Sequence, residues 1–238
     1  AGWKVTLNGA ILGALLVTPS CLLIVNFVCV PLGLPAVIGN VLGMALGSVA
    51  AFVMCRRFPA LVTPNYEQKP ESLPFTPEKK PNYGVIWTLR RVLADFSEAP
   101  FYGNEWASLG MLAGVLLAYA LSPLSPAYGS GLLLPMLAAQ ALTSLVGVIV
   151  WRRQWQIRGW YPTYVPLVSV VPAAVLTYGG GFTVMIASAL LGALTAPPLA
   201  CAIAQRLPKY LHPYIGNVLS MAISTLVILP VIGFMIAD

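Results

Sequence analysis

Charged residues are scarce in this chain, at 8% of its 238 residues. Because about a quarter of the residues in a soluble domain are charged, this composition argues against a soluble globular protein. The chain is instead 58% hydrophobic, which is typical of an all-α polytopic membrane protein. The formal net charge of +6 does not indicate nucleic-acid binding. The basic residues lie beside apolar segments, where they orient a chain in the bilayer.

Acidic residues, lysine, arginine and histidine are missing from every predicted membrane span, and the four cysteines form no C-x-x-C pair. Proton pumps rely on carboxylates within the membrane, and metal sites need clustered histidine, cysteine or acidic ligands. The sequence therefore predicts no metal site and no cofactor. It also offers no nucleophile–base pair, so an enzyme is the least favoured class. Coupling to Na⁺ or H⁺ stays open.

Seven segments are apolar enough to cross about 30 Å of hydrocarbon as helices with a rise of about 1.5 Å per residue. Two of them, 107–121 and 164–178, are short and could be tilted, extended or only partly spanning. The seven predicted spans are roughly 7–30, 35–54, 107–121, 131–150, 164–178, 182–203 and 214–236.

Basic residues occur in every second connection between these spans. The positive-inside rule therefore places the N-terminus in the cytoplasm and the C-terminus outside, in a membrane such as the bacterial inner membrane. Aromatic residues between 151 and 164 predict an interfacial belt. The orienting basic residues are Lys4, Arg56, Arg57, Arg90, Arg91, Arg152, Arg153, Arg158, Arg206 and Lys209.

The connection at 55–105 differs from the rest of the chain, with seven basic residues, six acidic residues and repeated prolines. This composition predicts an extended cytoplasmic loop. Apolar residues at helical spacing between Val85 and Phe96 predict an amphipathic helix at its end, on the inner membrane surface. A partner-binding helix is the alternative. The loop separates a transmembrane hairpin at 1–54 from spans at 106–180 and a second hairpin at 181–238.

One motif occurs twice. The sequence Ile-Gly-Asn-Val-Leu-x-Met-Ala stands at 38–45 and again at 215–222, and the segments 10–15 and 189–194 are also alike. Each element lies five positions before its copy in the order of the predicted spans, and an odd offset inverts the orientation. The first and last hairpins are therefore predicted to be inverted repeats, as in secondary transporters.

The extent of the repeat is open. If the unit has two helices, it flanks an unrelated central block. If the unit has five, the second copy is incomplete and needs further helices, from a longer chain or from a partner membrane chain. A homo-oligomer is also expected.

The duplicated motif provides the first candidate site. Asn40 and Asn217 follow Gly39 and Gly216 near the starts of their helices, where free backbone N–H groups suit an anion or a carboxylate. Alternatively, each amide caps its helix or bonds to a neighbouring helix that the glycine allows to approach.

Proline breaks provide the second candidate site. Proline removes an N–H and frees the carbonyl four residues earlier, so Thr18-Pro19 and Thr195 with Pro197 predict unwound, cavity-facing helices. A simple packing kink is the alternative. Four small residues predict a close helix contact, within the chain or with another subunit: Gly39, Gly43, Gly47 and Ala51.

Together these features favour a secondary transporter, or the membrane-embedded half of one, that carries a small polar or anionic solute by alternating access. The alternative is a non-catalytic membrane subunit that scaffolds a larger complex through the 55–105 segment.

Overall fold

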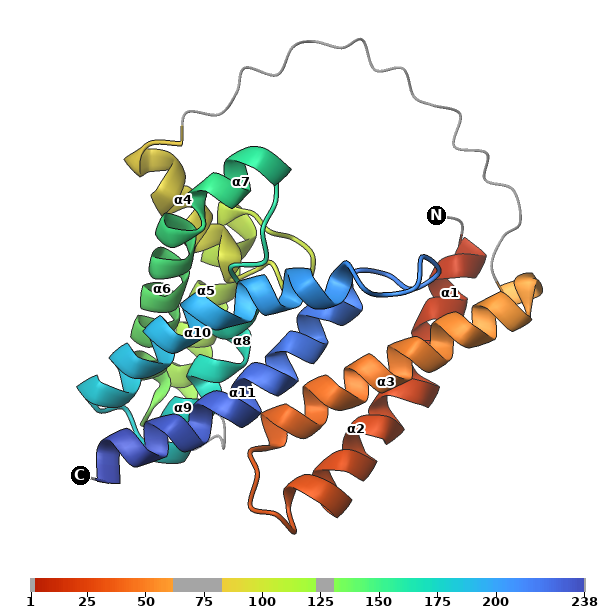
Figure 1. Cartoon of the computed structure of the whole chain (residues 1–238), viewed down its shortest axis with the longest axis horizontal. Helices are drawn as coiled ribbons and strands as arrows, with labels where there is room; N and C mark the ends of the chain where they lie inside the picture. The colour runs from red at the N-terminus through yellow and green to blue at the C-terminus, as the bar shows by residue number, and fades with distance from the viewer. Residues whose placement is uncertain (1–2, 62–82, 123–130, 238) are drawn as a thin grey trace.

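The computed structural model describes residues 3–61, 83–122 and 131–237, and these ranges contain helices and turns but no strand (Figure 1). Within these ranges, five helices are long and apolar enough to span a membrane, so this is an all-helical protein with the properties of an integral membrane protein. They are Val5–Cys29, Ala36–Arg57, Leu133–Val150, Phe182–Ala204 and Tyr214–Ala237. Two shorter apolar helices, Glu105–Leu121 and Val165–Tyr178, fall below spanning length.

The first hairpin pairs a composite helix with α3 (Ala36–Arg57). The composite helix consists of α1 (Trp3–Leu12), η1 (Gly13–Val17), α2 (Thr18–Ile24) and η2 (Val25–Cys29). The two η segments are π-helical. The predicted unwinding at Thr18-Pro19 is wrong, because the chain stays helical through the proline. The wider turn of η1 ends one residue before Thr18, and such π-bulges commonly accompany irregularities in helical hydrogen bonding.

Two glycines, Gly43 and Gly47, allow α3 to lie unusually close to this composite helix. A Cβ atom on Gly43 would lie 2.5 Å from the backbone of Cys21. One on Gly47 would lie 2.7 Å from the Cα of Val17. Real Cβ atoms do not come this near to backbone atoms, so only glycine fits, and the close contact along the glycine stripe lies within the chain.

The second hairpin consists of α10 (Phe182–Ala204) and α11 (Tyr214–Ala237). The predicted break near Thr195 and Pro197 is also wrong, since α10 is one continuous helix. Pro197 deprives the carbonyl of Ala193 of its helical partner, and the indole of Trp151 donates a 2.8 Å hydrogen bond to that carbonyl instead. With this carbonyl satisfied from outside the helix, α10 continues through the proline.

The broken helix lies elsewhere, in the most buried part of the fold. Helix α8 (Val165–Val168) and α9 (Val170–Tyr178) are separated at Ser169, whose φ and ψ are −129° and −77°. The side-chain amide of Gln140 donates a 2.9 Å hydrogen bond to the carbonyl of Leu167 beside this break. Gln140 belongs to α6 (Leu133–Val150), and α6, α10 and α11 surround the broken helix.

Helix α4 (Val85–Asp95) is the amphipathic helix that the sequence predicts, but part of its charged side faces inward. Asp95 is 1% exposed, whereas Val85 and Ile86 are 74% and 76% exposed. Helix α4 packs against α6 and against α5 (Glu105–Leu121). The side expected to be solvated is therefore partly a core contact.

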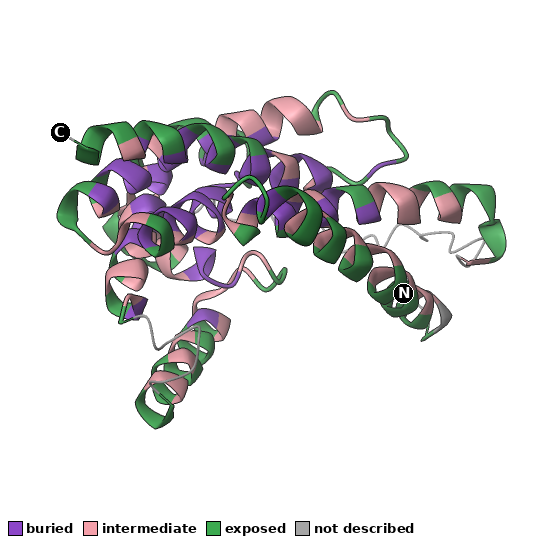
Figure 2. Ribbon diagram, turned by 90° about the horizontal axis from the view of Figure 1, so that it is seen from below, coloured by how far each residue is buried: buried purple, intermediate pink, exposed green. Residues whose placement is uncertain are grey.

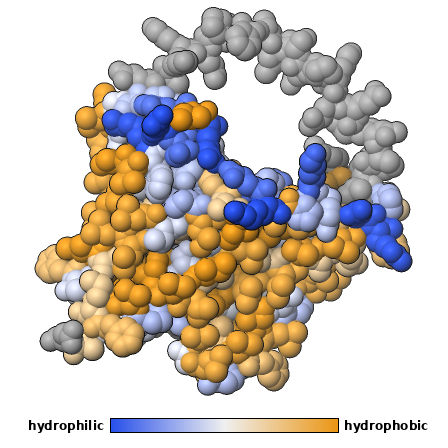
Figure 3. All heavy atoms as spheres, in the orientation of Figure 1, coloured by the Kyte–Doolittle hydropathy of each residue, from blue (hydrophilic) through white to orange (hydrophobic). Residues whose placement is uncertain are grey.

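Polar and apolar surfaces lie on different sides of the molecule. In Figure 3 the hydrophilic residues gather along the upper edge, and the surface below them is mostly hydrophobic. The short helix α7 (Arg152–Arg158) and the end of α3 lie toward that upper edge in Figure 1, whereas the α2–α3 connection lies at the lower edge. Purple, buried ribbon is concentrated in the central helices in Figure 2. Helix α5 buries only Ser108.

Candidate functional site: a cavity at the start of helix α11

A cavity of about 270 Å³ opens where α11 begins. Its walls come from α10, from the start of α11 and from two connections, the turn after α4 and the segment before α8. Most of the lining side chains are apolar or aromatic. The lining residues are Glu98, Phe101, Trp160, Tyr164, Ala200, Cys201, Ala204, His212, Pro213, Tyr214 and Asn217.

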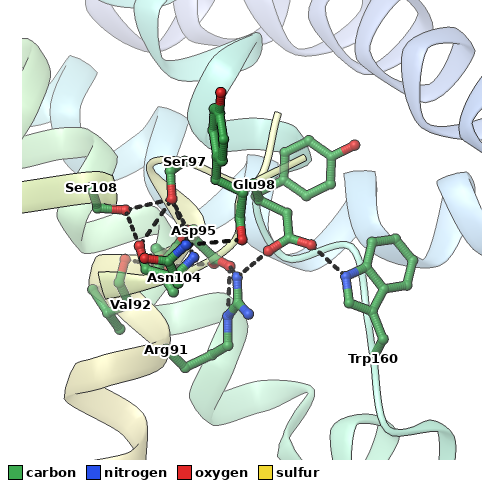
Figure 4. A network of polar contacts seen from close by, with 12 residues as sticks. Arg91, Val92, Asp95, Ser97, Glu98, Asn104, Ser108 and Trp160 are labelled. Atoms are coloured by element: carbon green, nitrogen blue, oxygen red, sulfur yellow. Dashed lines mark hydrogen bonds and ion pairs between the residues drawn. The ribbon is translucent and has the colours of Figure 1, made fainter. Parts of the chain in front are cut away.

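The carboxylate of Glu98 is held in place by two partners (Figure 4). Its Oε1 accepts a 2.6 Å hydrogen bond from the indole of Trp160, and its Oε2 pairs with the guanidinium of Arg91 at 2.5 Å. Arg91 also pairs with Asp95 at 2.8 Å and lies over the ring of Trp155. One cation therefore serves two carboxylates, and the three groups carry a net charge of −1 when all are ionised.

A tight turn after α4 carries Glu98 and Phe101 into the cavity wall. Ser97 fixes this turn, since its backbone carbonyl accepts from the N–H groups of Tyr102 and Gly103. Phe101 has a φ of 66°, the only positive value at a non-glycine residue in the described parts of the chain. Such backbone strain is tolerated where surrounding contacts impose it. The ring of Phe101 lies 5.6 Å from that of Tyr214.

Asn217 lies deep in the same cavity and is 7% exposed. Its side-chain amide donates a 3.0 Å hydrogen bond to the hydroxyl of Tyr164. The backbone N–H groups at the start of α11 are already used: those of Ile215 and Gly216 donate to the carbonyls of His212 and Pro213, at 3.1 Å and 2.9 Å. These N–H groups therefore do not provide the anion site expected at this helix start.

Asp95, the second carboxylate that pairs with Arg91, is buried and does not line the cavity. The Oδ2 of Asp95 accepts a 2.6 Å hydrogen bond from Ser144 of α6. Burial raises the pKa of Asp95, and the nearby Arg91 and Ser144 oppose this rise. A carboxyl group thus contacts a predicted span, although no predicted span contains an acidic residue.

A second cavity, of about 190 Å³, adjoins the first. Tyr164 and Tyr214 line both cavities. The second cavity extends between α3 and α11, and Val41 and Met44 of the first hairpin line it. The space at the start of α11 is therefore adjacent to the contact between the two hairpins.

The residues predicted from the sequence do not come together in one site. Only Asn217 lines the cavity. Asn40, Thr18, Pro19 and Thr195 are exposed. The remaining three are buried in helix contacts: Gly39 against η2, Gly216 against α10, and Pro197 within α10.

Sequence reasoning missed most of the cavity because several of its polar and aromatic residues belong to connections rather than spans. Trp160 and Tyr164 lie in the aromatic-rich segment that predicts an interfacial belt, yet Tyr164 is only 4% exposed. Glu98 ends the amphipathic segment. The informative signal was the concentration of aromatic residues and one carboxylate beside the spans. No family model, curated protein or solved structure matches this chain.

Proposed function

We propose that this protein is a secondary transporter, or the membrane-embedded half of one, built on two inverted hairpins. The observation that carries this proposal is the contact between the hairpins. Val41 and Ala45 of α3 pack in one cluster with Val218 and Ala222 of α11. These are equivalent positions of the duplicated motif. A twofold axis brings equivalent residues together, and an in-plane axis is the symmetry of inverted-repeat transporters.

The packing register within each hairpin supports the same duplication. A Cβ on Gly39 would lie 2.7 Å from the side chain of Val25, and one on Gly216 would lie 2.8 Å from the backbone of Ala204. Val25 and Ala204 each lie fifteen residues after the start of a matched segment (25 − 10 and 204 − 189). Gly39 and Gly216 therefore contact equivalent positions of the two copies.

The cavity provides the solute site in this proposal. It is mostly apolar with a few fixed polar groups, as small-molecule sites usually are. In the proposed orientation the basic residues, and hence the cavity, face the cytoplasm of a bacterial inner membrane. The N-terminus is cytoplasmic and the C-terminus is outside.

A scaffolding membrane subunit is the second candidate, and the exposed helix α5 favours it. Trp106 and Leu121 of α5 are each 77% exposed. Lipid covers such a surface in a transporter, whereas a partner chain or a second copy of this chain covers it in a scaffold.

Uptake by proteoliposomes tests the proposal. We expect saturable uptake from a panel of labelled small polar solutes, and at least a tenfold loss on Asn217→Ala, about the effect of one lost cavity hydrogen bond to a bound solute. Asn26→Ala is the control, because Asn26 is exposed and bonds only to its own helix. No uptake above empty liposomes, together with a stoichiometric co-purifying membrane protein, would support the scaffold.

A further inference from the structure

We infer that the cavity at the start of α11 binds a small organic cation, such as an amine or a quaternary ammonium group. This inference rests on the proposed function and names the substrate class of the same site. It departs from the anionic solute that the sequence suggests.

Charge is the first argument. Among the described residues, Glu98 is the only acidic one that lines the cavity, and no lysine or arginine lines it. The Nδ1 of His212 accepts a 3.2 Å hydrogen bond from the N–H of Tyr214. An anion would meet the carboxylate of Glu98 without a lysine or arginine in the described wall, whereas a cation meets an attractive charge.

The aromatic walls are the second argument. Phe101, Trp160 and Tyr214 line the cavity together with Tyr164. The π face of an aromatic ring attracts a cation, and several rings around one space form the cages that hold quaternary ammonium groups. Phe101 is in the left-handed backbone region, which costs free energy, and its ring lies beside that of Tyr214.

The size of the cavity is the third argument. At about 270 Å³ it is smaller than the roughly 300–1,000 Å³ of sites for drug-sized ligands. The ligand is therefore small, and its uncharged groups contact apolar walls. Asn217 and Tyr164 provide polar groups for a hydroxyl or amide on such a ligand.

Choline and its neutral isostere 3,3-dimethylbutan-1-ol form a matched pair of probes, since they differ only in carrying nitrogen or carbon at the centre. We expect the purified full-length chain in lipid nanodiscs to bind labelled choline in equilibrium dialysis. Unlabelled choline competes, but the isostere and acetate compete at least about tenfold more weakly, because they lack the positive charge.

Two variants locate the binding. Glu98→Gln lowers choline affinity by about tenfold or more through loss of the charge. Phe101→Leu keeps the apolar contact but loses the π face, and lowers affinity by about two- to fivefold. Phe101 is 73% exposed, so this second variant does not disturb the core. Glu105→Gln is the matched control, because Glu105 pairs with Arg90 outside the cavity and should leave binding unchanged.

Equal competition by the isostere, preferential binding of acetate, or unchanged affinity in both Glu98→Gln and Phe101→Leu would overturn the inference. Uptake of an anionic solute with no choline binding would overturn it and leave the transporter intact. Choline binding without any transport would support the cavity chemistry and argue against the proposed function.

Discussion

The indole Nε1–H of Trp151 donates a 2.8 Å hydrogen bond to the carbonyl oxygen of Ala193, the carbonyl that Pro197 deprives of its helical partner. Ala193 is fully buried. Without the indole, its carbonyl would lose the partner that replaces the missing N–H of residue 197. This one contact explains why α10 passes through a proline that the sequence marks as a break.

Replacing Trp151 with phenylalanine should therefore destabilise the protein by about 1–3 kcal/mol, the cost of an unsatisfied buried acceptor. In a Pro197→Ala background the restored backbone N–H can bond to Ala193, so the same replacement should cost less. Unfolding titrations in mixed micelles measure this double-mutant cycle. Trp106→Phe, at an exposed tryptophan, is the control. An equal cost in both backgrounds would show that Trp151 acts through packing alone.

The close contact between α2 and α3 depends on Gly43. Gly43→Ala places a methyl group 2.5 Å from the backbone of Cys21 and should cost about 1–3 kcal/mol by overpacking. Gly110→Ala on α5 meets nothing within 4 Å and should be neutral or stabilising by about 0.5–1 kcal/mol, as expected for glycine replaced within a helix. Thermal unfolding in one detergent compares them. Equal melting temperatures for the two variants would contradict the close approach.

The buried carboxyl of Asp95 should make stability depend on pH. Burial raises its pKa in the folded state, so the folded protein holds this proton to a higher pH than the unfolded chain does. The contribution of Asp95 to the free energy of unfolding is therefore complete below the pKa of the unfolded state, about 3.9. This contribution is lost as pH rises through the pKa of the folded state. Asp95→Asn should flatten this part of the profile of melting temperature against pH, and Arg91 keeps Glu98 as a partner. An unchanged profile would show that Asp95 does not titrate differently on folding.

Gly103 makes room for the carboxylate of Glu98. Its φ is 53°, and a Cβ there would collide with the Oε2 of Glu98. Gly103→Ala should lower stability and weaken ligand binding, because it displaces a carboxylate that Arg91 and Trp160 hold in place. Gly33→Ala is the matched control, since Gly33 also has a positive φ, of 65°, but has open space around it. It incurs only the left-handed backbone cost of about 1–2 kcal/mol. If Gly103→Ala and Gly33→Ala changed ligand binding equally, Glu98 would not be part of the binding site.

The long spans could be predicted from the sequence, because hydropathy over some twenty residues depends on composition alone. The spacing of Gly39, Gly43 and Gly47 likewise indicated a helix face suited to close contact. The location of the break could not be predicted in this way. Pro19 and Pro197 lie in continuous helices, while Ser169 breaks one, because neighbours such as Trp151 and Gln140 decide which carbonyls find partners.

The cavity was harder to predict for a related reason. Asn40 and Asn217 are equivalent in sequence but not in environment, since only Asn217 meets Tyr164. Hydropathy reasoning also assigns a charged helix side to water, whereas Asp95 and Arg91 of α4 bond to each other and Asp95 to Ser144. Such mutual satisfaction allows charges into a core, and it depends on tertiary contacts that periodicity does not encode.

The orientation of the two hairpins is the central claim, and labelling of their turns tests it most directly. In a cysteine-free background, Leu32→Cys marks the turn between η2 and α3, and Lys209→Cys marks the turn between α10 and α11; both positions are exposed. A membrane-impermeant maleimide applied to sealed vesicles of known orientation should label Leu32→Cys only from the outside and Lys209→Cys only from the cytoplasmic side. Labelling of both turns from the same side would contradict the inverted repeat.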